Sequence, residues 1–215
     1  YIGVAALAGL LLTACAETYK VLGATNVHEM EGKMLYLKVY DNDELRNMDS
    51  CRVTHGKFEF RGVADSVVMA NLFVGEQSVL PVVLEGSNIS LTIEEQVQSV
   101  SGSPLNDTLY SFIRHKLRLD EQLAALPSKE GRMVMDGMDH FEVVRILNRE
   151  ADSLAVESDR LTTSFIKRNI NNVLGPGVFM IMTSTYPYPV LTPLIEELFT
   201  IGTPYFLNHP YVKAY

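Results

Sequence analysis

The sequence predicts an α+β protein in which an antiparallel β-sandwich or open barrel is followed by an antiparallel helical hairpin and short helices. Two observations carry this prediction. Apolar and polar residues alternate in short segments between residues 17 and 101, whereas after 103 apolar residues recur every three or four positions. We therefore expect a strand region at 15–102 and a helical region at 103–215, both preceded by an apolar segment at 1–14.

Seven or eight short strands are expected in the first region. Strict alternation, which is typical of strands with one buried and one solvated face, is clearest in three segments: 35–40, 57–61 and 89–94. His55-Gly56 predicts a tight hairpin turn between strands at 50–54 and 57–62. Segments 67–74 and 78–84 are apolar almost throughout, which favours central strands.

The first helix is expected to start with Ser103 as N-cap and Pro104 in the first helical position. Its apolar stripe runs to Leu126, and Pro127 should end it.

A second helix is expected from near Asp136 to about Ile170, joined to the first by a glycine-containing loop. These two stripes predict the antiparallel hairpin. A third, short helix is expected at 192–199, after the proline-rich segment 186–189.

The charge balance excludes some partners. The chain has 26 acidic and 18 basic residues, a net charge of −8, and no run of Lys or Arg. Nucleic-acid binding requires cations that neutralise phosphates, so we expect no nucleic-acid partner. The same balance argues against polybasic attachment to an anionic membrane.

The apolar segment 1–14 resembles part of a secretory signal. It carries no charge and is too short for a bilayer, which needs about 20 apolar residues, but it fits the apolar core of a signal peptide, about 7–15 residues. It ends in Leu12-Thr13-Ala14-Cys15, the lipobox pattern of a branched apolar residue, two small residues and cysteine. We therefore expect Cys15 to carry a lipid that anchors a periplasm-facing protein in membrane lipid of the cell envelope. The alternative is a buried apolar helix with a core cysteine.

The chain starts at Tyr1 and lacks the positively charged region that precedes the core of a signal peptide. We therefore expect residues to be missing before Tyr1, and a further part of the protein to follow Tyr215.

The remaining cysteine offers little chemistry. With Cys15 lipidated, Cys51 has no partner for an internal disulfide, and the chain has no Cys-x-x-Cys for dithiol exchange. We expect Cys51 to be a buried core thiol that shares a strand face with Val53.

Three further patterns are weaker indications of a site. Met133, Met135 and Met138 are spaced for either a Cu(I) site of thioethers or, as we prefer, apolar anchoring of a loop. Ser164-Phe165-Ile166-Lys167 matches a Ser-x-x-Lys motif but lacks its partner motifs, so we interpret it as coincidence. The five His residues show no metal-ligand spacing. We therefore predict no catalytic, cofactor-binding or metal-binding residue, and no cofactor.

Ser66 is a candidate for modification. The Asp-Ser/Thr-apolar acceptor used for O-glycosylation of exported Bacteroidota proteins is matched by Asp65-Ser66-Val67, next to an expected strand start.

Several segments together resemble a known family. They follow in order along the chain: Leu22-Gly23, Leu35-Tyr36-Leu37, Asp49-Ser50, Gly56-Lys57-Phe58-Glu59-Phe60-Arg61-Gly62, Pro81-Val82-Val83-Leu84-Glu85-Gly86 and Ser101-Gly102-Ser103-Pro104-Leu105-Asn106-Asp107. The set is similar to a domain of unknown function found at the front of Bacteroidota lipoproteins, where it commonly precedes a TlpA/AhpC-TSA-type thioredoxin-like domain. The resemblance covers the strand region best and continues through the helical hairpin.

This resemblance implies a non-catalytic accessory module of a thiol:disulfide lipoprotein. The family's redox motif, Trp-Cys-x-x-Cys, belongs to the following domain, and nothing in this chain matches it. The expected partners are a downstream thioredoxin-like domain in the same chain and a periplasmic client protein. Two alternatives stay open: a stand-alone ligand-binding or protein-binding structural lipoprotein, and an enzyme with an unrecognised site.

Overall fold

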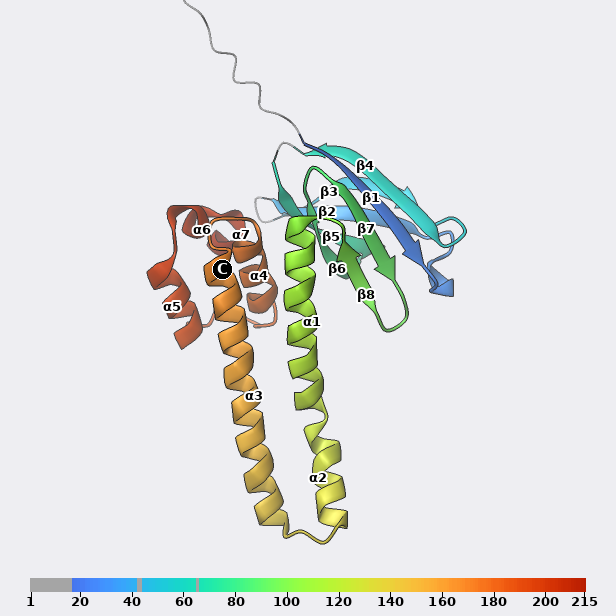
Figure 1. The fold of residues 1–215 in the computed structure, drawn as a ribbon. Coiled ribbons are helices and arrows are strands. Elements are labelled where there is room, and N and C mark those ends of the chain that lie inside the picture. The colour runs from blue at the N-terminus through green and yellow to red at the C-terminus, as the bar shows by residue number, and fades with distance from the viewer. Residues whose placement is uncertain (1–16, 42–43, 65) are drawn as a thin grey trace, which may run out of the picture.

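The computed structural model describes residues 17–41, 44–64 and 66–215 (Figure 1). Within them, eight strands precede the helices, which confirms the predicted α+β class. The strands and one short 3₁₀ helix are β1 (Glu17–Thr25), η1 (His28–Met30), β2 (Met34–Asp41), β3 (Glu44–Arg52), β4 (Lys57–Ala64), β5 (Val68–Val74), β6 (Gln77–Leu84), β7 (Asn88–Ile93) and β8 (Gln98–Ser101). The helices are α1 (Pro104–Ala124), α2 (Leu126–Met135), α3 (His140–Arg168), α4 (Leu174–Thr183), α5 (Pro193–Ile201), α6 (Pro204–Asn208) and α7 (Pro210–Lys213).

The strands form two four-stranded sheets, in the orders β4-β1-β7-β8 and β3-β2-β5-β6. Neighbouring strands are antiparallel, except for the parallel pair β1 and β7. Alternate side chains of both sheets join one buried cluster, which includes Val21 and Phe60 from the first sheet and Leu37 and Leu72 from the second. Of the two predicted architectures, the structure has the sandwich.

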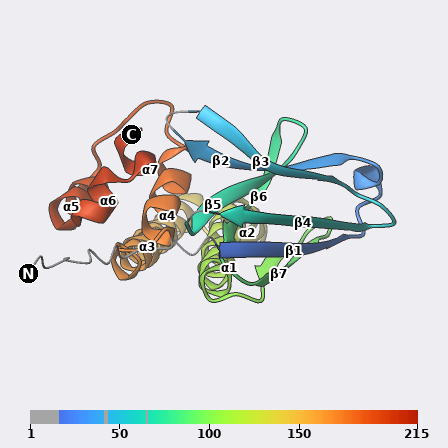
Figure 2. The ribbon, with the colours of Figure 1, turned by 90° about the horizontal axis from the view of Figure 1, so that it is seen from above.

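Helices α1 and α7 pack on the second sheet, and the C-terminal helices lie near one end of its strands (Figure 2). Tyr110 of α1 donates a hydrogen bond from its hydroxyl to the carbonyl of Pro81 (2.9 Å), and Tyr211 of α7 donates one to the carbonyl of Met69 (2.8 Å). Phe179 of α4 belongs to the same buried cluster as the strand residues. The strand region and the helical region therefore share one hydrophobic core.

The predicted hairpin turn between β3 and β4 is confirmed. His55 and Gly56 have φ angles of 52° and 68°, and Thr54 and Lys57 exchange backbone hydrogen bonds of 2.9 and 3.1 Å. Both central residues therefore lie in the left-handed region. This conformation defines the tight two-residue turn whose twist matches that of the flanking strands. The carboxylate of Glu31 accepts the amide hydrogens of His55 (2.9 Å) and Gly56 (3.0 Å) and so fixes the turn from outside.

The helical hairpin differs from the prediction at Pro127. This proline does not end the helical arm, because it lies in the first turn of α2, where its missing N–H needs no partner. Helix continues to Met135, and the connecting turn is confined to 136–139. Asp139 caps α3 by accepting the amide hydrogen of Glu142 (3.1 Å), so α3 begins at His140 rather than near Asp136.

The C-terminal helices are partly as expected. The predicted helix at 192–199 is confirmed as α5, with the hydroxyl of Thr192 accepting the amide hydrogen of Ile195 (3.3 Å). The apolar segment 178–183 belongs to α4, whose first turns also contain Gly175-Pro176-Gly177. A Cβ on Gly177 would lie 2.5 Å from the Met69 sulfur, so this glycine lets α4 approach β5 closely. No helix of the described residues is long and apolar enough to cross a membrane.

Candidate binding groove

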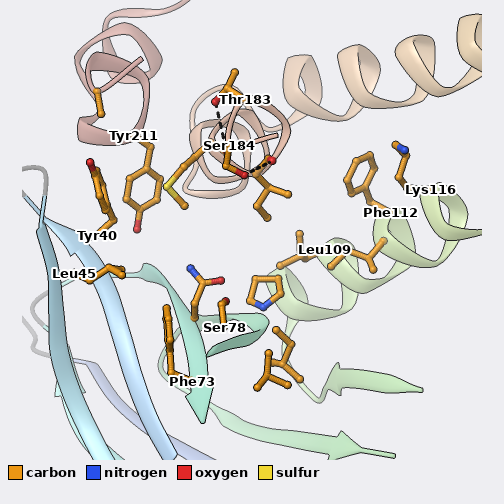
Figure 3. A pocket seen from close by; sticks show the side chains of 18 of the residues that line it. Tyr40, Leu45, Phe73, Ser78, Leu109, Phe112, Lys116, Thr183, Ser184 and Tyr211 are labelled. Atoms are coloured by element: carbon orange, nitrogen blue, oxygen red, sulfur yellow. Dashed lines mark hydrogen bonds between the residues drawn. The ribbon is translucent and has the colours of Figure 1, made fainter. Parts of the chain in front are cut away.

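An open apolar groove of about 780 Å³ lies between the second sheet and the helices that cover it (Figure 3). Its floor is formed by β5 and β6, and its walls by α1, α4 and the end of α7. The apolar lining consists mainly of Leu45, Phe73, Val79, Leu80, Pro81, Leu109, Phe112, Ile113, Leu117, Met180 and Ile181. Its size is typical of pockets that bind small molecules or short peptide segments.

The pairing of the two central strands of the second sheet ends beside the groove. Pairing between β2 and β5 runs only from Leu35–Val74 to Lys38–Asn71, although both strands continue beyond Lys38–Asn71. Where the pairing stops, Tyr211 donates its hydroxyl hydrogen to the Met69 carbonyl, and its ring lies 6.3 Å from that of Tyr40. A helix side chain thus satisfies a backbone group that a neighbouring strand would otherwise bind, and it closes this end of the groove.

Polar groups are spread along the groove. Asn71 and Ser78 lie on the floor, on β5 and β6, and Ser184 directly follows α4. The Ser184 hydroxyl donates to the carbonyl of Ile181 (2.8 Å), which fixes its oxygen as an acceptor (Figure 3). Lys116 lines one side and forms an ion pair with Asp120.

The groove lining is mostly apolar. Its lining contains no His, Cys, Asp or Glu.

The wall formed by α1 is fixed by Asn106. This side chain is fully buried, and its amide donates to the Val83 carbonyl (2.8 Å) and the Ser103 hydroxyl (2.8 Å), while its oxygen accepts the Val83 amide hydrogen (2.9 Å). The free edge of β6 is thereby paired by a side chain instead of a strand. Glu85 accepts the amide hydrogens of Leu105 (3.0 Å) and Asn106 (3.3 Å).

We name this set, Val83, Glu85, Ser103 and Asn106, the sheet–helix joint. The sequence did not predict its chemistry. Ser103 does occupy the N-cap position, but its hydroxyl makes no capping bond and accepts from Asn106 instead. The available signal was that Asn106 shares a helix face with the apolar Leu109 and Tyr110, where a polar side chain needs a partner.

The predicted site residues have different outcomes. Cys15 and the apolar segment 1–14 lie outside the described residues, so lipidation stays a prediction. Ser66 is exposed between β4 and β5, and its modification also stays a prediction. Cys51 is only partly buried, because β3 is an edge strand, although it packs on the core. Burial, and then the nearby Asp49 carboxylate, raise the pKa of the Cys51 thiol to about 12, so the unreactive thiol form dominates at neutral pH.

The methionines do not share one environment. Met133 packs on the small cluster of Leu126, Val143 and Leu147, whereas Met135 is 87% exposed. The packing of Met133 agrees with the preferred interpretation, which was apolar anchoring. Among the described residues, no group of three or more His, Cys, Asp or Glu side chains could hold a metal ion.

Of the Ser-x-x-Lys pattern, Lys167 makes a structural contact. Lys167 forms an ion pair with Glu197 of α5 (2.5 Å), and it thereby joins α3 to α5.

Comparison with known proteins assigns one region of the chain. Residues 19–109 match the family model of a domain of unknown function, DUF4369. No curated protein and no solved structure matches the chain. The matched region runs from β1 into the first turns of α1 and contains both sheets and the sheet–helix joint. The helices after Leu109 lie outside the match, so the expected resemblance through the helical hairpin is not supported.

The sequence segments that suggested the family come together in space. Gly23 lies opposite Phe58 and Gly62 opposite Tyr19 in the pairing of β1 and β4, and a Cβ on either glycine would overlap the facing aromatic ring. Similarly, segments 81–86 and 101–107 meet at the sheet–helix joint. These motifs thus stabilise the fold and contribute little to the groove lining.

Proposed function

We propose that the chain is a non-catalytic binding module of a lipid-anchored cell-envelope protein, and that its groove holds an apolar segment of a client polypeptide. The observation that carries the proposal is the groove itself: about 780 Å³, apolar, open to solvent, and lined by hydrogen-bonding groups but by no His, Cys, Asp or Glu. Binding would bury the apolar lining, which stabilises a complex by roughly 25 cal/mol for each Å² removed from water.

The distribution of polar groups favours a polypeptide over an acyl chain. Asn71, Ser78 and Ser184 lie on different parts of the lining. An acyl chain would cover Asn71 and Ser78 without offering them a hydrogen-bond partner, and each unpaired buried group costs about 1–3 kcal/mol. A polypeptide brings amide groups at regular intervals, so it can pair with polar groups on several walls at once.

The wider setting of the module is also part of the proposal. A lipid on Cys15 would hold the domain close to the membrane, because β1 begins only two residues later, at Glu17. The motif resemblance alone supports a place beside a thioredoxin-like domain, to which the groove would deliver its client. Two tests apply: Cys15→Ser should abolish lipid labelling, and the gene should encode Trp-Cys-x-x-Cys within about 100–150 residues after Tyr215. An early stop codon would exclude the downstream thioredoxin-like domain and favour the alternative, a stand-alone binding lipoprotein.

The groove is tested by a binding titration. The full chain in lipid nanodiscs is mixed with fluorescein-labelled α-lactalbumin that has been reduced and carboxymethylated, a soluble unfolded polypeptide. Ile181→Arg places a charge in the groove at a side chain that is 37% exposed, and Val156→Arg is the matched control on α3, 68% exposed and outside the groove. We expect Ile181→Arg to weaken binding about tenfold or more and Val156→Arg to leave it unchanged.

Two outcomes would contradict the proposal. Equal affinities for both variants would place polypeptide binding elsewhere. Displacement of the polypeptide by stoichiometric palmitate would show that the groove takes an acyl chain.

A further inference from the structure

The far end of the helical hairpin displays large apolar side chains to solvent. α2 and α3 meet there, at the end of two helical arms that project from the body of the protein (Figure 1). All nine residues of 134–142, which we name the hairpin tip, are exposed. Met135 is 87% exposed and Phe141 83%, and Val134 and Met138 are exposed to 41% and 38%.

The hairpin tip is an ordered turn. The amide hydrogen of Met138 is donated to the Met133 carbonyl (3.1 Å) and that of Gly137 to the Val134 carbonyl (3.0 Å). Gly137 has a φ of 88°, which a residue with a side chain adopts only with strain. Below the turn, Met133 packs on the small cluster of α2 and α3, and an ion pair between Lys129 and Glu150 (2.6 Å) joins the two helices. Apolar groups held in this way lose little conformational entropy when they bind.

The fold does not require these side chains. Met135 and Phe141 keep most of their surface in water, so they add almost nothing to the core. Contiguous exposed apolar side chains mark interaction sites, and the flexible thioether of Met adapts to varied partner surfaces. Both facts point to a partner at the hairpin tip.

The charges around the tip identify the kind of partner. The nine residues include Asp136, Asp139 and Glu142 and contain no Lys or Arg, and Glu142 forms an ion pair with Arg145 (3.3 Å) on the next turn of α3. An anionic lipid surface would repel this set. Two copies of the tip meeting symmetrically would place like charges against each other. A protein with an apolar pocket bordered by basic side chains complements both the apolar residues and the carboxylates.

We propose that the hairpin tip is a docking site that inserts Met135 and Phe141 into an apolar pocket of a second protein, with basic residues at the pocket rim. The direction of the hairpin also supports this proposal, provided that the proposed lipid anchor is correct. β1 begins at the end of the molecule opposite to the tip (Figure 1). An anchor that precedes β1 would leave the tip pointing away from the anchored membrane. α3 alone spans about 43 Å, from 29 residues that each rise about 1.5 Å.

Photo-crosslinking of the full chain in intact cells of its native host tests this proposal. The Phe141→p-benzoylphenylalanine variant places the reactive group at the tip, and Val156→p-benzoylphenylalanine is the matched control on the outer surface of α3. We expect one dominant protein adduct at 141 that is absent at 156. Met135→Ser should lower the yield of the adduct at 141 about tenfold, because the partner loses one apolar anchor. Asp136→Lys should also lower this yield, because it reverses a charge that the basic rim of the pocket would bind. Both substitutions should leave the melting temperature unchanged, because both side chains are exposed.

Other outcomes would overturn the proposal. An adduct with a second copy of the chain would identify a self-association surface. Adducts with lipid alone, or Met135-dependent flotation of the chain on phosphatidylethanolamine–phosphatidylglycerol vesicles, would identify a membrane contact. Absence of an adduct, or an adduct insensitive to both Met135→Ser and Asp136→Lys, would also contradict it. None of these results depends on the groove, so failure of the tip and failure of the proposed function are distinguishable.

Discussion

The sheet–helix joint and the hairpin tip depart from the usual distribution of residues in different ways. The joint buries a polar side chain, whereas the tip exposes apolar side chains. At the joint, Asn106 is fully buried, but three hydrogen bonds satisfy its amide group. At the tip, Met135 and Phe141 are almost fully exposed and contribute little to any cluster. A buried polar group with complete pairing stabilises the fold, whereas an exposed apolar group gains free energy only when another molecule covers it. The two regions should therefore respond oppositely to substitution.

The largest effect on stability is expected at the joint. Asn106→Leu keeps a similar volume but leaves the amide and carbonyl of Val83 unpaired in the interior, which should cost about 3 kcal/mol of unfolding free energy. Urea denaturation measures this, with Asn148→Leu on the exposed face of α3 as control. A loss below about 1 kcal/mol, similar to the control, would show that water pairs with β6 equally well.

The next largest effect is expected where β1 and β4 pair. Gly23→Ala introduces a Cβ into the space of the Phe58 ring, and the displaced ring should cost about 2 kcal/mol. Gly131→Ala is the matched control, because it lies in α2 with no atom within 4 Å of the added Cβ. This control should be neutral or stabilising by up to about 1 kcal/mol, from better helix propensity. Equal effects of both substitutions would contradict the role given to Gly23.

A smaller, pH-dependent effect is expected at Glu31. Hydrogen bonds from the amides of Gly56 and His55 lower the pKa of the Glu31 carboxyl in the folded state. A lowered folded pKa stabilises the protein above the unfolded pKa, and the contribution is lost as the pH falls through the folded pKa. The stability difference between the natural chain and Glu31→Gln should therefore shrink from about pH 5 to about pH 3. Thermal unfolding over this range measures it, and a constant difference would rule out the carboxylate contribution.

The smallest effect on stability is expected at the tip. Met135→Ser and Phe141→Ser should change the unfolding free energy by no more than about 0.5 kcal/mol, because their side chains are exposed in the folded state. Met133→Ser, two residues away, should cost clearly more, since Met133 packs on Leu126 and Val143. A large loss at Met135 would mean that the tip contributes to folding, and would remove the contrast with the joint.

Local patterns of the sequence predicted most of the fold. Alternation identified the strand region, and His55-Gly56 identified its tightest turn, because both depend on neighbours in sequence. Pro127 misled the prediction, since proline is unfavourable inside a helix but favourable in its first turn. The grouping of Met133, Met135 and Met138 favoured apolar anchoring, which holds for Met133 but not for Met135. Residues two apart on a helix point to nearly opposite sides, which explains their different burial.

The groove could not be predicted in the same way. Its lining joins β5 and β6 to α1, α4 and α7, so residues as distant as Phe73 and Ile181 face one space. The closing bond from Tyr211 to Met69 links positions 142 residues apart. Such contacts depend on how the helices pack on the face of the sheet. No local pattern of the sequence indicates this packing.

One titration series tests the central claim, that the groove binds an apolar polypeptide segment, most directly. The affinity of labelled, reduced and carboxymethylated α-lactalbumin is measured for the full chain and for Ile181→Arg, Phe141→Ser and Val156→Arg, with the melting temperature of each recorded. We predict unchanged melting temperatures and a loss of about tenfold or more in affinity for Ile181→Arg alone. An affinity that Ile181→Arg leaves unchanged, or that all three substitutions lower equally, would contradict the claim.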